Sequence, residues 1–260
     1  RGIIAALACG ACLFQASSAW GAAINLRAAA FVKTMADGRP VPMWGYAQEA
    51  VFGEQLGTVT SPGPVIVVPT GDNTLSITLD NDLTEGTSIV IPGLAVPTVT
   101  GGTATAGDHN RIASTRGSRA VSFVPETPAG NTAAVTYTWS GVAPGTYLYH
   151  SGSHVGLQVQ MGLYGAVKTT DLYPGITTVP TSDHVLLYSE VDADLHDAVA
   201  DESYGSDAPG AIKSTIKSVP QYFLVNGHAY PEAELVIPSG SVGDTVLLRL
   251  LTAGQDSRVP

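Results

Sequence analysis

Short apolar runs separated by turn-forming residues recur along most of the chain. Residues 65–68 are continuously apolar, whereas residues 74–79 and 133–139 alternate apolar and polar positions. Alternation with a period of two is typical of strands that bury one face, and the intervening Gly, Pro, Asn and Asp favour turns. Long amphipathic helical patterns are scarce. We therefore predict an all-β chain folded as a Greek-key β-sandwich.

Length and composition predict how the strands divide into domains. The 260 residues are 44% hydrophobic and 13% charged, which is typical of a well-buried globular chain. We predict a complete first domain at residues 24–170, a turn-rich linker at residues 171–182 and a partial second domain at residues 183–260. The Asn226-Gly227 pair predicts a tight turn between two strands of the second domain.

The first residues have the three regions of a secretory signal peptide. Arg1 precedes an apolar centre, and small residues follow near Ala22, so we predict a signal peptide at residues 1–23 and a secreted or periplasmic protein. The apolar run at residues 3–14 is shorter than the roughly 20 residues that a membrane span needs. Cys9 and Cys12 both lie in this segment, so the mature chain would have no thiolate. Since the chain opens without Met, we also expect it to be part of a longer protein.

The net charge of -10 at pH 7 argues against two classes of partner. Nucleic acids and anionic membranes attract basic surfaces, so we expect neither as a partner of the mature chain. An acidic segment at residues 192–202, which contains His196, leaves two interpretations open. It is either a short helix over residues 192–200 or a loop for calcium or a transition metal, although its spacing matches no EF-hand. Asp108 and His109 form a weaker metal candidate in a Gly-rich loop.

Two histidines flank a small, flexible bend at the centre of the chain. The predicted strand at residues 146–149 ends at His150, and His154 follows after Ser-Gly-Ser. Imidazole is a common ligand of copper, zinc and iron, and a central glycine lets two rings converge. The alternative is a pair of hydrogen-bonded, half-exposed histidines without a metal. Met43, Trp44 and Tyr46 raise a similar choice, and we interpret them as core residues of a first strand.

The residues around these histidines resemble the end of the first domain of multicopper oxidases. Residues 144–151 read Pro-Gly-Thr-Tyr-Leu-Tyr-His-Ser and residues 162–165 read Gly-Leu-Tyr-Gly, in the family's order. The family separates its two histidines by one residue, whereas three residues separate them here. The resemblance implies a cupredoxin-like fold, copper as cofactor, His150 and His154 as copper ligands, and Tyr149 and Gln158 as residues that orient the imidazoles.

Residues 61–94 resemble an earlier segment of the same domain, but its two histidines are replaced. Val90 and Pro92 stand in their places, and neither side chain can bind copper. The family's trinuclear cluster takes two imidazoles from each of four His-x-His motifs. Such a cluster cannot be assembled from this chain in the family's way. Either a reduced copper site remains, or the domain has kept the fold and lost the metal.

The resemblance implies a function for the longer protein. A multicopper oxidase takes electrons from a small-molecule reducing substrate and passes them through copper to O₂. We favour such an oxidoreductase, with the mononuclear copper site outside this chain because the thiolate is missing. The alternative is a non-catalytic cupredoxin-like module that binds copper or acts as a scaffold. A third hypothesis is that the domain resembles copper nitrite reductases, with Met161 as a copper ligand, although Ser151 stands where their cysteine would be. Because trimers are typical of that family, a homo-oligomer of this chain is a further possibility under this hypothesis.

Overall fold

The structure is a computed structural model, and it describes residues 22–101, 122–130, 133–229 and 241–255. Strands dominate the described residues, with two short α-helices and one 3-10 helix. In chain order the elements are β1 (Ala22–Thr34), β2 (Pro40–Glu49), β3 (Ile66–Val68), β4 (Thr74–Asn81), β5 (Thr98–Thr100), β6 (Val135–Ser140), β7 (Thr146–His150), α1 (Val155–Met161), β8 (Tyr164–Thr169), β9 (Ser182–Val191), α2 (Ala193–Ala200), η1 (Thr215–Lys217), β10 (Tyr222–Val225), β11 (His228–Ala229) and β12 (Val246–Thr252).

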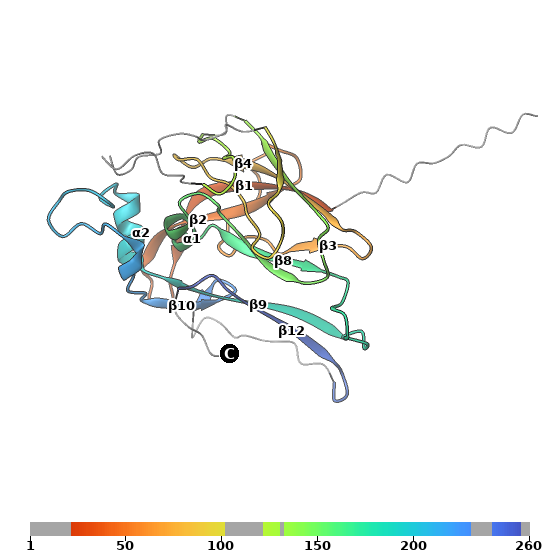
Figure 1. Ribbon diagram of the computed structural model, residues 1–260. Helices are drawn as coiled ribbons and strands as arrows, with labels where there is room; N and C mark the ends of the chain where they lie inside the picture. The colour runs from red at the N-terminus through yellow and green to blue at the C-terminus, as the bar shows by residue number, and fades with distance from the viewer. Residues whose placement is uncertain (1–21, 102–121, 131–132, 230–240, 256–260) are drawn as a thin grey trace, which may run out of the picture.

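Two sheets form a sandwich in the amino-terminal part of the chain (Figure 1). A five-stranded sheet has the order β2-β1-β4-β6-β5, and a three-stranded sheet has the order β3-β8-β7. Both sheets are mixed, because β1 pairs in parallel with β4 and β3 pairs in parallel with β8. The prediction of an all-β sandwich is confirmed.

The core of the sandwich follows the alternation of the sequence. In β4 every second residue from Leu75 to Leu79 is fully buried, and in β6 Val135, Tyr137 and Trp139 are buried. The rings of Tyr137 and Trp139 stack with their centroids 6.5 Å apart. Burial of these apolar side chains is the main favourable term for the fold.

The glycine that closes the central motif has a packing role. Gly165 pairs with Tyr149 across β7 and β8, and the Tyr149 ring covers it so closely that a Cβ at position 165 would overlap the ring. The Tyr149 hydroxyl then donates to the Pro64 carbonyl oxygen at 3.0 Å. Absence of a side chain at Gly165 thus allows a fully buried tyrosine to join β7 to the segment before β3.

A separate four-stranded sheet, β11-β10-β9-β12, lies beneath the sandwich (Figure 1). The predicted tight turn between β10 and β11 is confirmed, because Asn226 and Gly227 have φ angles of 50° and 82°. The Asn226 side chain also accepts a hydrogen bond from Leu187 N–H and donates to the Val185 carbonyl oxygen, both at 2.9 Å. The domain boundaries proposed from the sequence stay a prediction.

Two segments take helical structure. The apolar stretch after His154 forms α1, which ends at Gly162 with φ at 119°. The acidic segment forms α2, whose N-cap Asp192 accepts a hydrogen bond from Leu195 N–H at 3.1 Å. The helix interpretation of that segment is confirmed and the metal-loop interpretation is wrong, since residues 193–200 are helical and no three His, Cys, Asp or Glu side chains of the described residues gather as a metal site. Asp194 and Asp197 instead form ion pairs with Arg39. No helix in the described ranges is long and apolar enough to cross a membrane.

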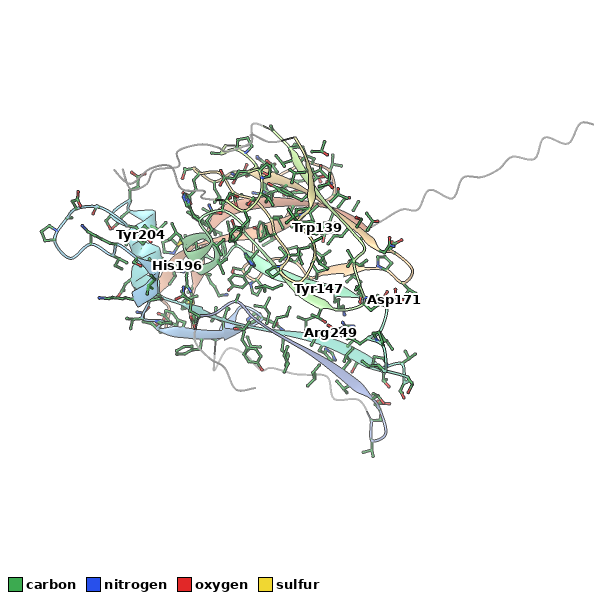
Figure 2. All side chains as sticks on the ribbon, viewed as in Figure 1. Trp139, Tyr147, Asp171, His196, Tyr204 and Arg249 are labelled. Atoms are coloured by element: carbon green, nitrogen blue, oxygen red, sulfur yellow. The ribbon has the colours of Figure 1, made fainter. Side chains whose placement is uncertain are left out.

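Two buried side chains join the lower sheet and α2 to the sandwich, and they lie well apart along the junction (Figure 2). The Arg249 side chain on β12 reaches β7 and β8, and it is 3% exposed. The His196 imidazole on α2 has Nδ1 2.6 Å from the Pro42 carbonyl oxygen and Nε2 2.9 Å from that of Gln160. Burial lowers the pKa of His196 below its ordinary value of 6.5, and this effect exceeds the opposing effect of the hydrogen bonds.

Candidate metal centre

His150 is the last residue of β7 and is almost buried, with 9% of its surface exposed. Its Nδ1 lies 2.8 Å from the Ser151 carbonyl oxygen. A carbonyl oxygen can only accept, so Nδ1 carries the proton and the neutral ring presents Nε2 as a lone pair. Burial lowers the pKa of His150, which favours the neutral ring that a metal requires. A histidine held in this way by a backbone carbonyl is the usual arrangement for a metal ligand.

His154 has a different environment. It stands at the N-cap position of α1 in the left-handed region, with φ at 39°, and its side chain makes no capping hydrogen bond. Its Nδ1 lies 3.8 Å from Glu85 Oε2. A non-glycine residue rarely adopts this backbone conformation, and His154 stands at the start of α1, whereas His150 ends β7.

The segment that lacks the two family histidines lies directly beside His150. Val90 and His150 form an antiparallel bridge, with N–H to carbonyl distances of 2.9 and 3.0 Å in the two directions. The Val90 side chain also packs against Gly152. Pro92 occupies the following turn and is exposed. The backbone frame expected from the resemblance is therefore present, but Val90 places an apolar side chain beside the imidazole.

A hydrogen-bonded polar cluster surrounds the same loop. Gln158 on α1 is fully buried, and its Oε1 accepts hydrogen bonds from Thr87 at 2.8 Å and from Ser151 at 2.5 Å. Its Nε2 donates to the Gly86 carbonyl oxygen at 2.9 Å and to Glu85 Oε1 at 3.2 Å. All four hydrogen-bonding positions of this amide are thus used by protein groups.

Three serines form a second cluster on the other side of the loop. Ser153 Oγ lies 3.0 Å from Ser88 Oγ and 3.1 Å from Ser122 Oγ, and the Ser88 and Ser122 hydroxyls are 3.0 Å apart. Sequence reasoning missed both polar clusters, because single Ser and Thr residues in loops give no periodic signal. The one available signal was the small polar Ser-Gly-Ser bend itself.

The two residues predicted to orient the imidazoles do something else. The Tyr149 hydroxyl donates to the Pro64 carbonyl oxygen, and the polar atoms of Gln158 are used within its own cluster. Neither side chain hydrogen-bonds to a histidine ring, so this expectation is wrong. The Ser151 carbonyl oxygen holds His150 instead. Asp108 and His109 lie outside the described residues.

Comparison with known proteins confirms the family resemblance. Residues 58–171 match the family model of multicopper oxidases, and this segment includes the Val90 turn and the loop from His150 to His154. A search of curated proteins found no match. The sandwich is cupredoxin-like, as expected, because the structure resembles solved multicopper oxidases and a copper nitrite reductase.

Three of these structures show how far the likeness extends. The copper nitrite reductase of Nitrosomonas europaea is 17% identical to this chain, with a TM-score of 0.59. The match covers 90% of this chain and 68% of the reductase chain. A multi-copper oxidase of Pseudomonas thermotolerans is 18% identical with a TM-score of 0.58, covering 89% and 46%. The blue copper oxidase of Nitrosomonas europaea is 20% identical with a TM-score of 0.57, covering 89% and 61%. At these identities the likeness concerns the fold, and the chain spans between about half and two thirds of each structure.

Multicopper oxidases and these structural neighbours are copper-binding proteins, which raises the question of whether the described residues could hold a copper ion. His150 fits as one ligand, since its Nδ1 is held and its Nε2 is available. The remaining surroundings do not fit, because Val90 and Pro92 replace two ligands and the neighbouring polar groups are hydroxyls and an amide already bonded to one another. Across the part of the chain that the structure describes, no three His, Cys, Asp or Glu side chains gather as a metal site. These residues alone do not make a copper centre.

Proposed function

We propose that the chain is the amino-terminal part of a multicopper-oxidase-like protein that oxidises a small reducing substrate and transfers the electrons through copper to O₂. The observation that carries this proposal is His150, which stands in the family's motif with Nδ1 on a backbone carbonyl and Nε2 available for a metal. Copper, when bound, would supply the one-electron chemistry that such a reaction needs.

The domain would contribute one rigidly positioned copper ligand, His150. His150 is rigid because β7 pairs with β8 on one side and bridges Val90 on the other. His154 is a second candidate whose ring would have to leave Glu85. The other ligands would come from outside the described residues or from a second copy of the chain, which makes a homo-oligomer part of this proposal.

A second candidate function is a non-catalytic cupredoxin-like scaffold. The specific observation that favours it is the fully bonded Gln158 amide, which together with Ser151 and Thr87 fills the space beside His150 with structural hydrogen bonds. A fully satisfied cluster of this kind would stabilise the loop around His150 without a metal.

Copper analysis separates the two functions. The protein would be loaded with copper, dialysed, and measured by elemental analysis and electron paramagnetic resonance, alongside His150→Ala. His228→Ala is the matched control, because His228 is exposed on β11. Copper that binds to wild type and to the control but is lost in His150→Ala supports the oxidase proposal. Absence of copper from all three proteins, or equal copper in all three, contradicts it and favours the scaffold.

We also propose that the protein is exported to the periplasm or secreted. The support is the signal-peptide pattern of residues 1–23, in which Arg1 precedes an apolar run at residues 3–14 and small residues follow near Ala22. Mass spectrometry of the amino terminus in the exported fraction tests this. Recovery of the unprocessed chain from the cytoplasm alone would contradict it.

A further inference from the structure

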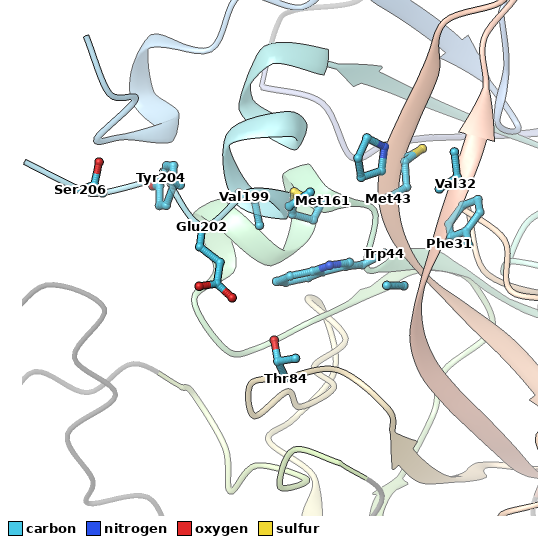
Figure 3. A pocket seen from close by; sticks show the side chains of 14 residues that line it. Phe31, Val32, Met43, Trp44, Thr84, Met161, Val199, Glu202, Tyr204 and Ser206 are labelled. Atoms are coloured by element: carbon cyan, nitrogen blue, oxygen red, sulfur yellow. The ribbon is translucent and has the colours of Figure 1, made fainter. Parts of the chain in front are cut away.

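A cavity of about 720 Å³ lies between the sandwich and the segment after α2. Its walls come from β1 and β2 on one side and from residues 199–206 on the other, with Met161 at the end of α1 (Figure 3). Small-molecule sites commonly have volumes of about 300 to 1,000 Å³ and lie where two parts of a protein meet. The cavity is therefore large enough for a small organic molecule.

Most of the cavity wall is apolar. The Trp44 indole extends into it, with Met161 and Val199 on the α-helical side and Phe31 and Met43 on the side of the strands (Figure 3). Met43, Met161 and Val199 are at most 5% exposed and Trp44 is 8% exposed, so a ligand would meet mainly the exposed part of the Trp44 indole and the more exposed Phe31 and Val32 side chains.

The polar side of the cavity is acidic. Among the described residues that line it, Glu202 carries the only carboxylate, and the Glu202 side chain projects toward the end of the Trp44 ring (Figure 3). None of the described residues that line the cavity is Lys, Arg or His. Glu202 also adopts a left-handed conformation with φ at 64°, where glycine or asparagine is less strained. The chain thus holds an acidic side chain at a position that favours other residue types.

We propose that this cavity binds a small organic monocation with an apolar body, such as an arylalkyl amine. The ammonium group would pair with the Glu202 carboxylate, and the apolar body would lie against the exposed part of the Trp44 indole. An organic anion is disfavoured, because the described residues of the wall offer a carboxylate and no base. A bare metal ion is also disfavoured, since a single carboxylate gives it too few ligands. The proposal does not depend on copper or on His150.

The test is a calorimetric titration of the full chain with three matched probes. 2-Phenylethylamine is the cation, 2-phenylethanol has the same body without charge, and phenylacetate is the anion. We expect the amine to bind about fivefold more tightly than the alcohol, as for a partly exposed ion pair, and phenylacetate not to bind. In Glu202→Gln the amine should bind no more tightly than the alcohol.

Two further variants keep the test decisive. Ala200→Trp places a large side chain at an exposed residue of the cavity wall, so it should weaken both amine and alcohol without disturbing the core. Glu54→Gln removes an exposed carboxylate that does not line the cavity, and it should behave as wild type. The proposal is overturned if Glu202→Gln binds the amine as tightly as wild type, if the alcohol binds as tightly as the amine, or if no probe binds.

Discussion

Arg249 on β12 donates a hydrogen bond from Nη1 to the carbonyl oxygen of Gly145 at 3.2 Å, and this contact joins the lower sheet to the turn that opens the central motif. The same guanidinium donates to Thr146 Oγ1 at 2.8 Å and to the Thr169 carbonyl oxygen at 3.2 Å, and it pairs with Asp183 at 2.7 Å. A single buried cation therefore orders the position of β7 and β8 relative to β9 and β12.

Replacing this cation should destabilise the protein strongly. We expect Arg249→Met to lower the free energy of unfolding by about 3 kcal/mol, because it leaves the Gly145 and Thr169 carbonyl oxygens without their buried donor and Asp183 with one partner fewer. Urea unfolding followed by circular dichroism measures this. Lys168→Met is the control, because Lys168 also pairs with Asp183 but is more exposed, and it should cost only about 0.5 kcal/mol. Equal losses in the two variants would refute the role of Arg249.

His196 should make stability depend on pH. Its folded-state pKa lies below the ordinary value of 6.5, chiefly because burial disfavours the charged ring. A depressed pKa means that the stabilisation is fully present above pH 6.5 and is lost as the pH falls toward the folded-state value.

The measurement is the free energy of unfolding of wild type and His196→Gln between pH 5 and pH 8. The difference between the two proteins should shrink as the pH falls below the ordinary value of 6.5. Subtraction removes the contribution of other groups, including His150. A difference in unfolding free energy that is constant across this range, or that grows at low pH, would show that burial does not lower the pKa of His196.

Gly165 should not tolerate a side chain. Gly165 pairs with Tyr149 across β8 and β7, and a Cβ at position 165 would overlap the Tyr149 ring. We expect Gly165→Ala to lower the free energy of unfolding by about 2 kcal/mol, because the fully buried tyrosine has no room to move. Tyr149→Phe removes the hydroxyl but keeps most of the ring that would overlap the new Cβ, so Tyr149→Ala is the better second substitution. Tyr149→Ala by itself will destabilise the protein, but adding Gly165→Ala to it should cost much less than in wild type.

The Gln158 amide and the Ser151 hydroxyl should act as one unit. Removing either group takes one hydrogen bond from its buried partner, so we expect Gln158→Leu and Ser151→Ala each to cost about 2 kcal/mol. The double variant should cost about 1 kcal/mol less than the sum, because the hydrogen bond between the two groups is counted in both single variants. Thermal unfolding of the four proteins gives this coupling. Strict additivity would mean that the two groups do not depend on one another.

Local patterns predicted a large share of the fold. The alternation in β4 and β6, the Asn226-Gly227 hairpin and the short helix over the acidic segment all appear in the structure. Each of these features depends on residues within a few positions of one another, so the local sequence pattern is enough to predict it. The motif from Pro144 to Gly165 likewise showed a resemblance to multicopper oxidases, whose family model matches residues 58–171.

The candidate site could be predicted only in outline. The motif named His150 and the missing ligands at Val90 and Pro92, and the structure places Val90 directly beside His150. It could not name the Ser and Gln clusters, because their partners are far apart in the chain: Gln158 bonds to Thr87, and Ser153 bonds to Ser88. Nor could it indicate that His154 would turn toward Glu85.

The sequence alone determined the strand-rich class, the resemblance to multicopper oxidases and the presence of Val90 and Pro92 where that family has histidines, since these follow from residue identities and short spacings. Only the tertiary structure decided which groups Arg249 and His196 contact and that Glu202 lines a cavity. Their partners come from strands and loops as many as 154 positions away, as with His196 and Pro42. The energy of a buried charge or imidazole depends on the groups that packing brings within hydrogen-bonding distance, and packing is a property of the whole fold.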